Sequence, residues 1–240
     1  MWKGKKVSVI FPTYNEKESI YDSINDFFAN GYVDEIVVVN NNAAKGTSQE
    51  VRKTKAREVF EKKQGYGYAI IKGLNEAKGD LLIISEPDST FVGDDVIKLL
   101  AYSDDFDVVF STRTTKNMIW EGANMGLFLK WGNWAIAKII EVLFNTTTLT
   151  DVGGSMRLLS RKALNKIQRH FTVGGSHFGP EVMLLAIIKK MKFVEIPVNY
   201  KKRVGKSSVT GSKFKAFILG LQMINIVLCY RFKSWLGLIK

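Results

Sequence analysis

Residues 6–30 read KVSVIFPTYNEKESIYDSINDFFAN, and this stretch decides the expected fold. Its first six residues are mostly apolar, which predicts a buried strand over residues 6–11. Apolar side chains then recur at helical spacing from Ile20 to Phe28, so residues 16–30 are predicted to form a helix. A buried strand that leads directly into an amphipathic helix is the repeating unit of α/β folds with a parallel sheet.

The same alternation continues along the rest of the chain. Further strands are predicted at residues 35–39, 58–60, 80–85, 107–111 and 193–200. Further helices are predicted at residues 66–77, 94–102, 122–144, 179–190 and 214–233. We therefore expect an α/β domain over residues 1–212, built on a mostly parallel sheet flanked by helices, and a C-terminal amphipathic helix over residues 213–240.

The composition describes a folded protein that lacks the residues for two common kinds of site. Of the 240 residues, 46% are hydrophobic and 24% are charged, which is enough apolar material for a sizeable core. Cys229 is the only cysteine, which excludes an internal disulfide and fits a reducing compartment. His170 and His177 are the only histidines, which argues against a zinc site of the usual His and Cys type.

The net charge of +12 indicates an anionic partner, such as a nucleotide, an acidic membrane surface or a nucleic acid. Residues 196–240 contain nine basic and no acidic side chains, whereas residues 1–195 contain 26 basic and 23 acidic ones. The excess charge therefore belongs to one basic loop and the helix that follows it. No recognisable nucleic-acid-binding motif accompanies this charge, so we expect no nucleic acid partner.

Polar residues follow three of the predicted strands, at residues 11–16, 40–42 and 85–88. Because the carboxyl ends of parallel strands meet at one edge of the sheet, these loops together predict a ligand cleft there. Each loop alone has a simpler interpretation, since Thr13 or Asn15 could merely cap the following helix.

Glu86 and Asp88 are the sharpest feature of these loops. Two carboxylates two residues apart, directly after an apolar strand, can point into the same cleft. Mg²⁺ and Mn²⁺ prefer oxygen ligands, often one or two carboxylates together with substrate phosphates. The pair therefore predicts a divalent metal, Mg²⁺ or Mn²⁺, that would neutralise a leaving diphosphate. The alternative is a solvated acidic turn.

The segment Gly65-Tyr66-Gly67 suggests a dinucleotide-binding loop, but the pattern fails. Ile70 stands where the third glycine is required, and no clear strand runs into the segment. We expect the glycines instead to let a helix N-terminus approach a phosphate or another strand.

Six segments carry a family resemblance. VSVIFPTYNE (7–16), EIVVVNNNAAKGT (35–47), QGYGYAIIKGLNEAKGD (64–80) and LLIISEPDS (81–89) resemble, in this order, the first half of family 2 inverting glycosyltransferases with a Rossmann-like GT-A fold. The second half is similar to the polyprenyl-phosphate sugar transferases of that family, such as dolichyl-phosphate mannose synthases, through DVGGSMRLLSRKAL (151–164) and FGPEVMLLAIIKKMKFVEIPVNYKKRVGKSS (178–208). The resemblance implies a nucleotide-sugar half over about residues 1–112 and an acceptor half over about residues 113–212.

The resemblance implies a nucleotide-sugar site at the first three strand ends. The residues that it assigns to this site are Pro12, Thr13, Tyr14, Asn15, Glu16, Asn40, Asn41, Lys72, Glu86 and Asp88. Asn40 and Asn41 stand where the family usually has Asp, so base recognition there would use amides rather than carboxylates. Glu86 and Asp88 occupy the family's D-x-D metal motif, with Asp88 as the more secure metal ligand.

The resemblance implies a second set of residues on the phosphate and acceptor side. These are Arg113, Arg157, Arg203, Lys206 and Ser207, of which the last three lie in a loop that would close over the diphosphate. The implied catalytic residues are Asp88, Glu181 and Arg203. Glu181 would act as general base for a hydroxyl acceptor, although it could instead cap a helix or pair with Arg157.

The predicted helix at residues 214–233 has a broad apolar surface and one narrow polar stripe, and basic and aromatic residues follow at its end. This pattern suits a helix that lies in a membrane interface. The alternatives are packing against the domain or against a second copy of the chain, which would make a homo-oligomer. No window reaches the ~20 apolar residues of a spanning helix, so we expect a peripheral protein on the cytosolic face of a membrane.

Together these features predict a metal-dependent inverting glycosyltransferase that moves a sugar from a UDP- or GDP-sugar to a polyprenyl phosphate. Three alternatives stay open: the same donor chemistry with a saccharide hydroxyl as acceptor, a basic nucleic-acid-binding protein, and an inactive nucleotide-sugar binder. The water solubility of the product would separate a lipid acceptor from a saccharide acceptor.

Overall fold

The computed structural model describes residues 1–205, 207 and 211–239. Within this part of the chain, seven strands form one sheet in the order β3-β2-β1-β4-β6-β5-β7. The strands are β1 (Val7–Thr13), β2 (Glu35–Asn40), β3 (Arg57–Phe60), β4 (Leu81–Ile84), β5 (Val108–Thr112), β6 (Arg157–Ser160) and β7 (Phe193–Pro197). β6 runs antiparallel to its neighbours β4 and β5, and the other neighbouring pairs are parallel. The predicted mostly parallel sheet is confirmed.

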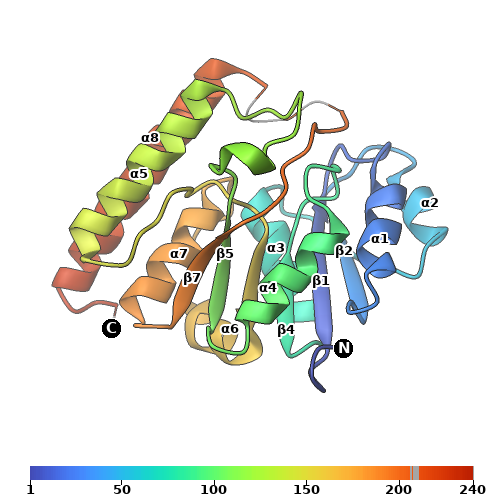
Figure 1. Cartoon of the computed structure of the whole chain (residues 1–240), viewed down its shortest axis with the longest axis horizontal. Helices are drawn as coiled ribbons and strands as arrows, with labels where there is room; N and C mark the ends of the chain where they lie inside the picture. Colours follow the sequence, from blue (N-terminus) through green and yellow to red (C-terminus); the bar gives the residue numbers. More distant parts are fainter. Residues whose placement is uncertain (206, 208–210, 240) are drawn as a thin grey trace.

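Helices cover both faces of the sheet and make three layers (Figure 1). One face carries α1 (Ile20–Ala29), α2 (Thr47–Arg52) and α4 (Val96–Tyr102); the other carries α3 (Tyr66–Glu76), α5 (Leu127–Phe144), α6 (Arg161–Ile167), α7 (Phe178–Ile188) and α8 (Lys213–Trp235). Successive strand residues point to opposite faces, so Phe11 packs on Phe27 of α1 while its neighbour Ile10 packs against Gly73 of α3. The buried strands therefore supply two cores, one on each face.

The first helix begins at Ile20 rather than at residue 16. The Glu16 carboxylate accepts hydrogen bonds from the backbone N–H groups of Tyr14 (2.7 Å) and Asn15 (2.9 Å). These bonds hold the residues after β1 in a turn, so the chain becomes helical only after the turn. The polar loop that the sequence predicts at this edge is therefore longer than expected.

Three further elements differ from the expected ones. The apolar stretch at residues 122–144 becomes helical only at Leu127, because Gly122 takes a left-handed backbone conformation (φ 77°) and starts a turn. The last strand ends at Pro197, three residues earlier than expected. α6 is a short helix that the sequence did not predict; the Ser160 side chain caps it by accepting a backbone N–H from its first turn (3.1 Å).

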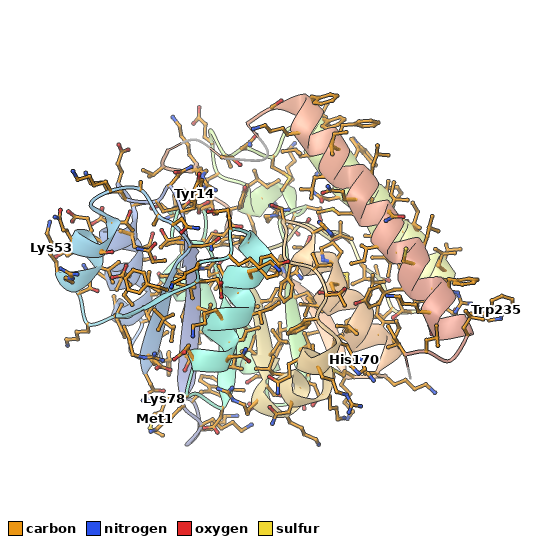
Figure 2. The ribbon with its side chains drawn as sticks, turned by 180° about the vertical axis from the view of Figure 1, so that it is seen from behind. Met1, Tyr14, Lys53, Lys78, His170 and Trp235 are labelled. Carbon is orange, nitrogen blue, oxygen red and sulfur yellow. The ribbon has the colours of Figure 1, made fainter. Side chains whose placement is uncertain are left out.

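β1 and β4 lie side by side at the point where the strand order reverses. From β1 the chain proceeds to β2 and β3 on one side, and it returns to β4 on the other side. Loops that leave such a pair of strands diverge, which opens a crevice beyond their carboxyl ends. Figure 2 shows Tyr14 at this edge of the molecule, with Met1 and Lys78 at the opposite edge.

α5 and α8 lie side by side along one flank of the molecule (Figure 1). α8 buries Met223, Val227 and Tyr230 against the domain, so one of its sides is a packing surface. Its other side, together with part of α5, exposes large apolar side chains, and we call this surface the apolar face. Its members are Leu127, Phe128, Trp131, Trp134 and Val142 of α5 and Phe214, Phe217, Ile218, Leu221, Leu228, Phe232 and Trp235 of α8.

Among the described residues, the stretch Phe214–Trp235 of α8 is long and apolar enough, by length and composition, to cross a membrane. The expectation that no segment is long enough was therefore wrong, because Gln222 and Asn225 interrupt the apolar run without making the helix polar overall. A buried helix of a soluble core passes the same test, but only 22% of the most apolar 18-residue window of this stretch is buried. Figure 2 shows Trp235, near the end of this helix, pointing away from the domain.

Candidate active site

A cavity of about 660 Å³ opens at the crevice between β1 and β4. Polar and charged residues line the end at the sheet edge, which we call the charged chamber: Thr13, Tyr14, Glu16, Asn41, Tyr66, Glu86, Arg113, Arg157, Arg203 and Ser207. Apolar residues of α5, α7 and α8 line the other end, which we call the apolar groove: Leu129, Ile136, Ile139, Phe178, Val182, Phe217, Leu219, Met223 and Ile224. The cavity thus joins a polar site at the sheet to a groove beside the apolar face.

Arg203 contacts three carboxylates in the charged chamber. Its Nη2 lies 2.6 Å from Oε1 of Glu16, and its Nη1 lies 3.6 Å from Oε2 of Glu86. Nη1 also donates a hydrogen bond to Asp88, whose side chain is fully buried. Carboxylates from the loops after β1 and β4 therefore converge on one cation at this edge of the sheet.

Hydrogen bonds within each loop set the positions of these carboxylates. Glu16 is held by the two backbone N–H groups that form the turn before α1. Asp88 Oδ1 accepts a hydrogen bond from the backbone N–H of Thr90 (3.0 Å) and another from its hydroxyl (2.5 Å). Both carboxylates are therefore preorganised before any ligand binds.

Glu86 is the carboxylate whose protonation is most affected by the chamber. Burial raises the pKa of Glu86 to about 8, and the adjacent Asp88 adds to the effect while Arg203 opposes it. Glu86 and Asp88 already face a cation, and two carboxylates suit a Mg²⁺ or Mn²⁺ ion that takes its other ligands from phosphate and water. Among the described residues, no group of three or more His, Cys, Asp or Glu side chains is placed to hold a metal alone.

Arg113 and Arg157 both line the chamber, but their surroundings differ. Arg113 donates to both oxygens of buried Asp151 (2.8 and 2.9 Å); burial opposes its charge, yet Asp151 outweighs burial and raises its pKa. Arg157 donates instead to the backbone carbonyls of Val152, Gly154 and Gly179, and burial lowers its pKa to about 10. Arg157 is thus a buried cation held by neutral groups, which suits it to attract an anionic ligand.

Gly179 in the first turn of α7 makes room for Arg157. A Cβ at this position would lie 2.4 Å from Nη2 of Arg157. The start of α7 therefore determines where this guanidinium lies in the chamber.

Tyr66 is a chamber residue that the sequence did not single out. Burial and the nearby Glu86 carboxylate raise the pKa of its phenol. Its only sequence signal is the Gly65-Tyr66-Gly67 motif, in which the glycines rather than the tyrosine suggested a function. Gly67 donates its N–H to the Gly174 carbonyl (2.9 Å), so the helix start packs closely against the loop that contains Gly174.

Asn40 and Asn41 use their side-chain amides within the protein. Asn40 donates to Glu58 (2.9 Å), and Asn41 donates to the backbone carbonyls of Glu61 and Lys63 (both 2.8 Å). Asn41 borders the cavity, and Asn40 is not among its described lining residues. Asn40 thus ties the end of β2 to β3, and Asn41 ties it to the segment after β3. Their part in reading a base stays a prediction.

Two further predicted site residues lie outside the cavity lining that the structure describes. Lys72 lies on the outer side of α3, where its Nζ is 2.8 Å from Glu76, and it does not border the cavity as described. Glu181 is also outside the described cavity lining, because its fully buried carboxylate accepts hydrogen bonds from the hydroxyls of Thr172 and Tyr230 (both 2.6 Å). It therefore neither caps α7 nor pairs with Arg157; it fastens α8 to α7.

The remaining predicted site residues have simpler placements. Pro12, Thr13, Tyr14 and Ser207 border the cavity, and Asn15 contributes a backbone N–H to Glu16. Lys206 lies outside the residues that the structure describes.

The family model for glycosyl transferase family 2 matches residues 8–168, which is more than half of the chain. The chain belongs to glycosyltransferase family 2. The match runs from β1 through α6, so this glycosyltransferase carries Glu16, Glu86, Asp88, Arg113 and Arg157 within the matched region.

Two relatives of the transferase have closely related names. It is 26% identical over 206 residues to the dolichyl-phosphate hexose transferase of Haloferax volcanii, which covers 85% of this chain and 86% of the relative. It is 28% identical over 240 residues to the undecaprenyl-phosphate 4-deoxy-4-formamido-L-arabinose transferase of Salmonella paratyphi A, covering 94% of this chain and 67% of the relative.

Solved structures confirm the GT-A fold of the transferase. A glucosyl-3-phosphoglycerate synthase from Mycobacterium tuberculosis, crystallised with Mn²⁺, UDP-glucose and phosphoglyceric acid, superposes with a TM-score of 0.72 at 16% identity, covering 95% of this chain and 80% of the synthase. The same synthase with Mg²⁺ and UDP gives a TM-score of 0.71 at 15% identity, covering 95% and 79%. At these identities the likeness establishes the fold.

Proposed function

We propose that this glycosyltransferase moves a sugar from a nucleoside-diphosphate sugar, UDP- or GDP-linked, to a polyprenyl phosphate, with inversion and with Mg²⁺ or Mn²⁺. The observation that carries the proposal is the continuity of the charged chamber with the apolar groove. A nucleotide sugar fits the charged end, and an acceptor that combines a phosphate with a hydrocarbon chain uses both ends. Two relatives whose names contain dolichyl phosphate and undecaprenyl phosphate support the same acceptor class.

On the donor side, the end of β1, the loop that follows it and the loop after β4 supply the binding groups. Pro12, Thr13 and Tyr14 line the cavity and would contact the nucleoside. Glu86 lines the cavity too, and it would hold the metal together with Asp88, which is buried behind the lining and contacts Arg203. When bound, the metal neutralises charge on the leaving diphosphate. Two further chamber residues, Arg203 and Ser207, would face the diphosphate from the segment between β7 and α8.

On the acceptor side, Arg157 and Arg113 would bind the phosphate of the lipid. Gly179 lies against Arg157, and the next residues of α7, Pro180 and Val182, border the cavity, so a phosphate at Arg157 would send its hydrocarbon chain into the apolar groove. A phosphate oxygen forms the new bond to the anomeric carbon as the bond to the diphosphate breaks on the opposite side. The diphosphate leaves with the electrons of the broken bond. Because the attack comes from the side opposite the leaving group, the anomeric configuration is inverted.

The placement of Glu181 supports a phosphate acceptor over a saccharide hydroxyl. A hydroxyl must lose a proton as it attacks and so requires a positioned base, whereas a phosphate is already anionic. Glu181 is buried among its hydrogen-bond donors outside the cavity lining that the structure describes. The chamber therefore offers cations for an anionic acceptor and does not offer the base that the sequence suggested.

The apolar face supports a location at the surface of a membrane, which we propose to be the cytosolic face. The apolar groove lies between α5 and α8, and both helices contribute to the apolar face. A lipid acceptor could therefore pass from the bilayer into the groove without crossing water. Basic residues of the same region, such as Arg231 and Lys233, would each contribute about 1 kcal/mol on an anionic leaflet.

Transfer of radiolabel from UDP- and GDP-sugars to a short polyprenyl phosphate, measured in the organic phase, tests the proposal. Asp88→Asn should reduce transfer at least about 100-fold, because it removes a charged ligand of the metal. A 100-fold loss corresponds to about 2.7 kcal/mol of transition-state stabilisation. Asp105→Asn removes an exposed carboxylate and should leave transfer unchanged. Full activity of Asp88→Asn or in EDTA argues against the metal role, and label in a water-soluble product argues for the saccharide alternative.

A further inference from the structure

We infer that Arg203 is a built-in cation that occupies the metal position of the donor site until a metal and a diphosphate displace it together. The inference rests on the donor half of the proposed function and adds an internal competitor to it. It follows from where the Arg203 guanidinium lies, from how its backbone is held and from which of its groups is left without a partner.

The guanidinium of Arg203 is paired with the same carboxylates that would hold the metal. It contacts Asp88 directly, Glu16 at 2.6 Å and Glu86 at 3.6 Å. A divalent ion and a guanidinium cannot both share these oxygens, since two cations at such distances repel strongly in a buried site. Metal binding to Asp88 therefore requires the Arg203 side chain to move.

The backbone of residues 201–205, which we call the strap, is docked on the metal loop. The Lys201 N–H donates to the Thr90 carbonyl (2.8 Å), and the Val204 N–H donates to the Asp88 carbonyl (3.0 Å). The Lys201 ammonium also lies 4.6 Å from the ring centre of Trp120. Figure 1 shows the chain after β7 crossing above the carboxyl edge of the sheet, where it can deliver Arg203 to the carboxylates.

The ion pairs of Arg203 can be replaced by ligands, and its guanidinium is not fully hydrogen-bonded. The Nε of Arg203 is buried without a hydrogen-bond partner among the described residues. A metal ion can take over the carboxylates, and a diphosphate can take over the guanidinium, so the two ligands together replace every ion pair that they break. A metal alone gives Arg203 no anion, which predicts weak binding of metal alone and mutual strengthening of metal and nucleotide binding.

Mn²⁺ titration followed by electron paramagnetic resonance tests the inference, with and without UDP and with no sugar or acceptor present. Arg203→Gln should bind Mn²⁺ alone at least about tenfold more tightly than the unmodified protein, because a competing charge is removed. Arg203→Lys retains the charge and should fall between the two. Lys202→Gln removes a neighbouring exposed charge and should change Mn²⁺ affinity by less than about twofold.

UDP provides the second measurement. In the unmodified protein UDP should increase the affinity for Mn²⁺ markedly. In Arg203→Gln this increase should be smaller, by about the same factor by which the substitution raises the affinity for Mn²⁺ without UDP. Circular dichroism confirms that each variant is folded, and Arg203→Lys keeps the test valid if the glutamine variant does not fold.

The inference is overturned if Arg203→Gln binds Mn²⁺ alone no more tightly than Lys202→Gln or the unmodified protein. Absence of Mn²⁺ binding in every variant, even with UDP, overturns it together with the metal part of the proposed function. Failure of lipid glycosylation while the Mn²⁺ and UDP pattern holds overturns only the proposed acceptor, so the two failures can be told apart.

Discussion

Glu86 makes the stability of the charged chamber depend on pH. Burial and the neighbouring Asp88 raise its pKa from near 4.5 to about 8 in the folded protein. Because the folded-state pKa lies above the unfolded one, the stabilisation from protonated Glu86 is complete below about pH 4.5 and is lost as the pH rises through about 8. Metal binding should also become easier over the same range, since the ligand must be deprotonated.

Glu86→Gln should flatten the pH dependence of thermal stability in metal-free protein, because glutamine cannot ionise. Between pH 5 and pH 8.5 the melting temperature of the unmodified protein should fall by at least about 3 °C more than that of Glu86→Gln, which corresponds to about 1 kcal/mol. Thermal unfolding followed by circular dichroism measures the difference. Asp105→Asn should follow the unmodified protein; two parallel profiles for Glu86→Gln and the unmodified protein would show that Glu86 does not titrate in this range.

Glu181→Gln should damage stability more than catalysis. The carboxylate accepts hydrogen bonds from Thr172 and Tyr230 in the protein interior, and an amide cannot accept all of them. We expect a loss of about 2 kcal/mol in the free energy of unfolding, from hydrogen bonds to a buried charge. Urea unfolding measures this loss. Transfer per folded molecule at low temperature should stay within about threefold, whereas loss of a general base costs about 100-fold or more.

At the scale of the element, the first turn of α7 positions the acceptor cation. Gly179→Ala should raise KM for the polyprenyl phosphate, because the new Cβ would lie 2.4 Å from Arg157 and displace it. We expect an increase of about tenfold, since charge-assisted hydrogen bonds to a phosphate are worth roughly 1.5–3 kcal/mol. Gly126→Ala places its Cβ where no atom lies within 4 Å and should leave KM unchanged.

Affinity for UDP with Mn²⁺ provides the second readout for this substitution. It should be the same in Gly179→Ala as in the unmodified protein, because the change lies on the acceptor side of the chamber. An equal loss of donor and acceptor affinity would point to general disruption of the cavity rather than to displacement of Arg157.

The elements themselves differ in how far local sequence predicts them. Strands such as β2 and β4 are short apolar runs buried on both faces, and their local pattern is sufficient. The start of α1 depends on the Glu16 turn, and α6 depends on its cap at Ser160. Such boundaries arise from single hydrogen bonds that compete with helix propensity, so periodicity alone misplaces them.

At the scale of the whole molecule, the apolar face is the surface that would contact a lipid membrane. The double substitution Leu228→Glu and Phe232→Glu should abolish binding to anionic vesicles, because it places two charges on exposed positions of α8 (52% and 58% exposed). Co-sedimentation with vesicles measures the change. Ile97→Glu with Tyr102→Glu alters two similarly exposed apolar residues on α4 (42% and 45%) and should leave vesicle binding intact.

The competing occupant of the apolar face is a second copy of the chain. Sedimentation velocity in vesicle-free buffer distinguishes the two: a dimer that dissociates in the α8 double variant, combined with no vesicle binding by the unmodified protein, would assign the face to self-association.

In the candidate site too, features set by neighbouring residues could be predicted from the sequence, and contacts between distant residues could not. The loops that carry Glu16, Glu86 and Asp88 could be placed at one sheet edge from sequence, because parallel strands bring their carboxyl ends together. The convergence of those carboxylates on Arg203 could not, since 115 residues separate Asp88 from Arg203 and their contact depends on how the strap crosses the sheet. The sequence did not predict Tyr66 as a site residue for the same reason, because only the packing of α3 places it near Glu86.

By itself the sequence determined the α/β layering, the polar loops at the strand ends and the family resemblance, because these depend on short-range periodicity and on motifs read in order. Only the tertiary structure decided which polar groups are free and which are already used. Glu181, Asn40 and Lys72 carry suitable chemistry in the sequence, but each is already paired with another side chain of the same protein. The union of the charged chamber with the apolar groove was decided in the same way, because it requires α5, α7 and α8 to pack beside the sheet edge.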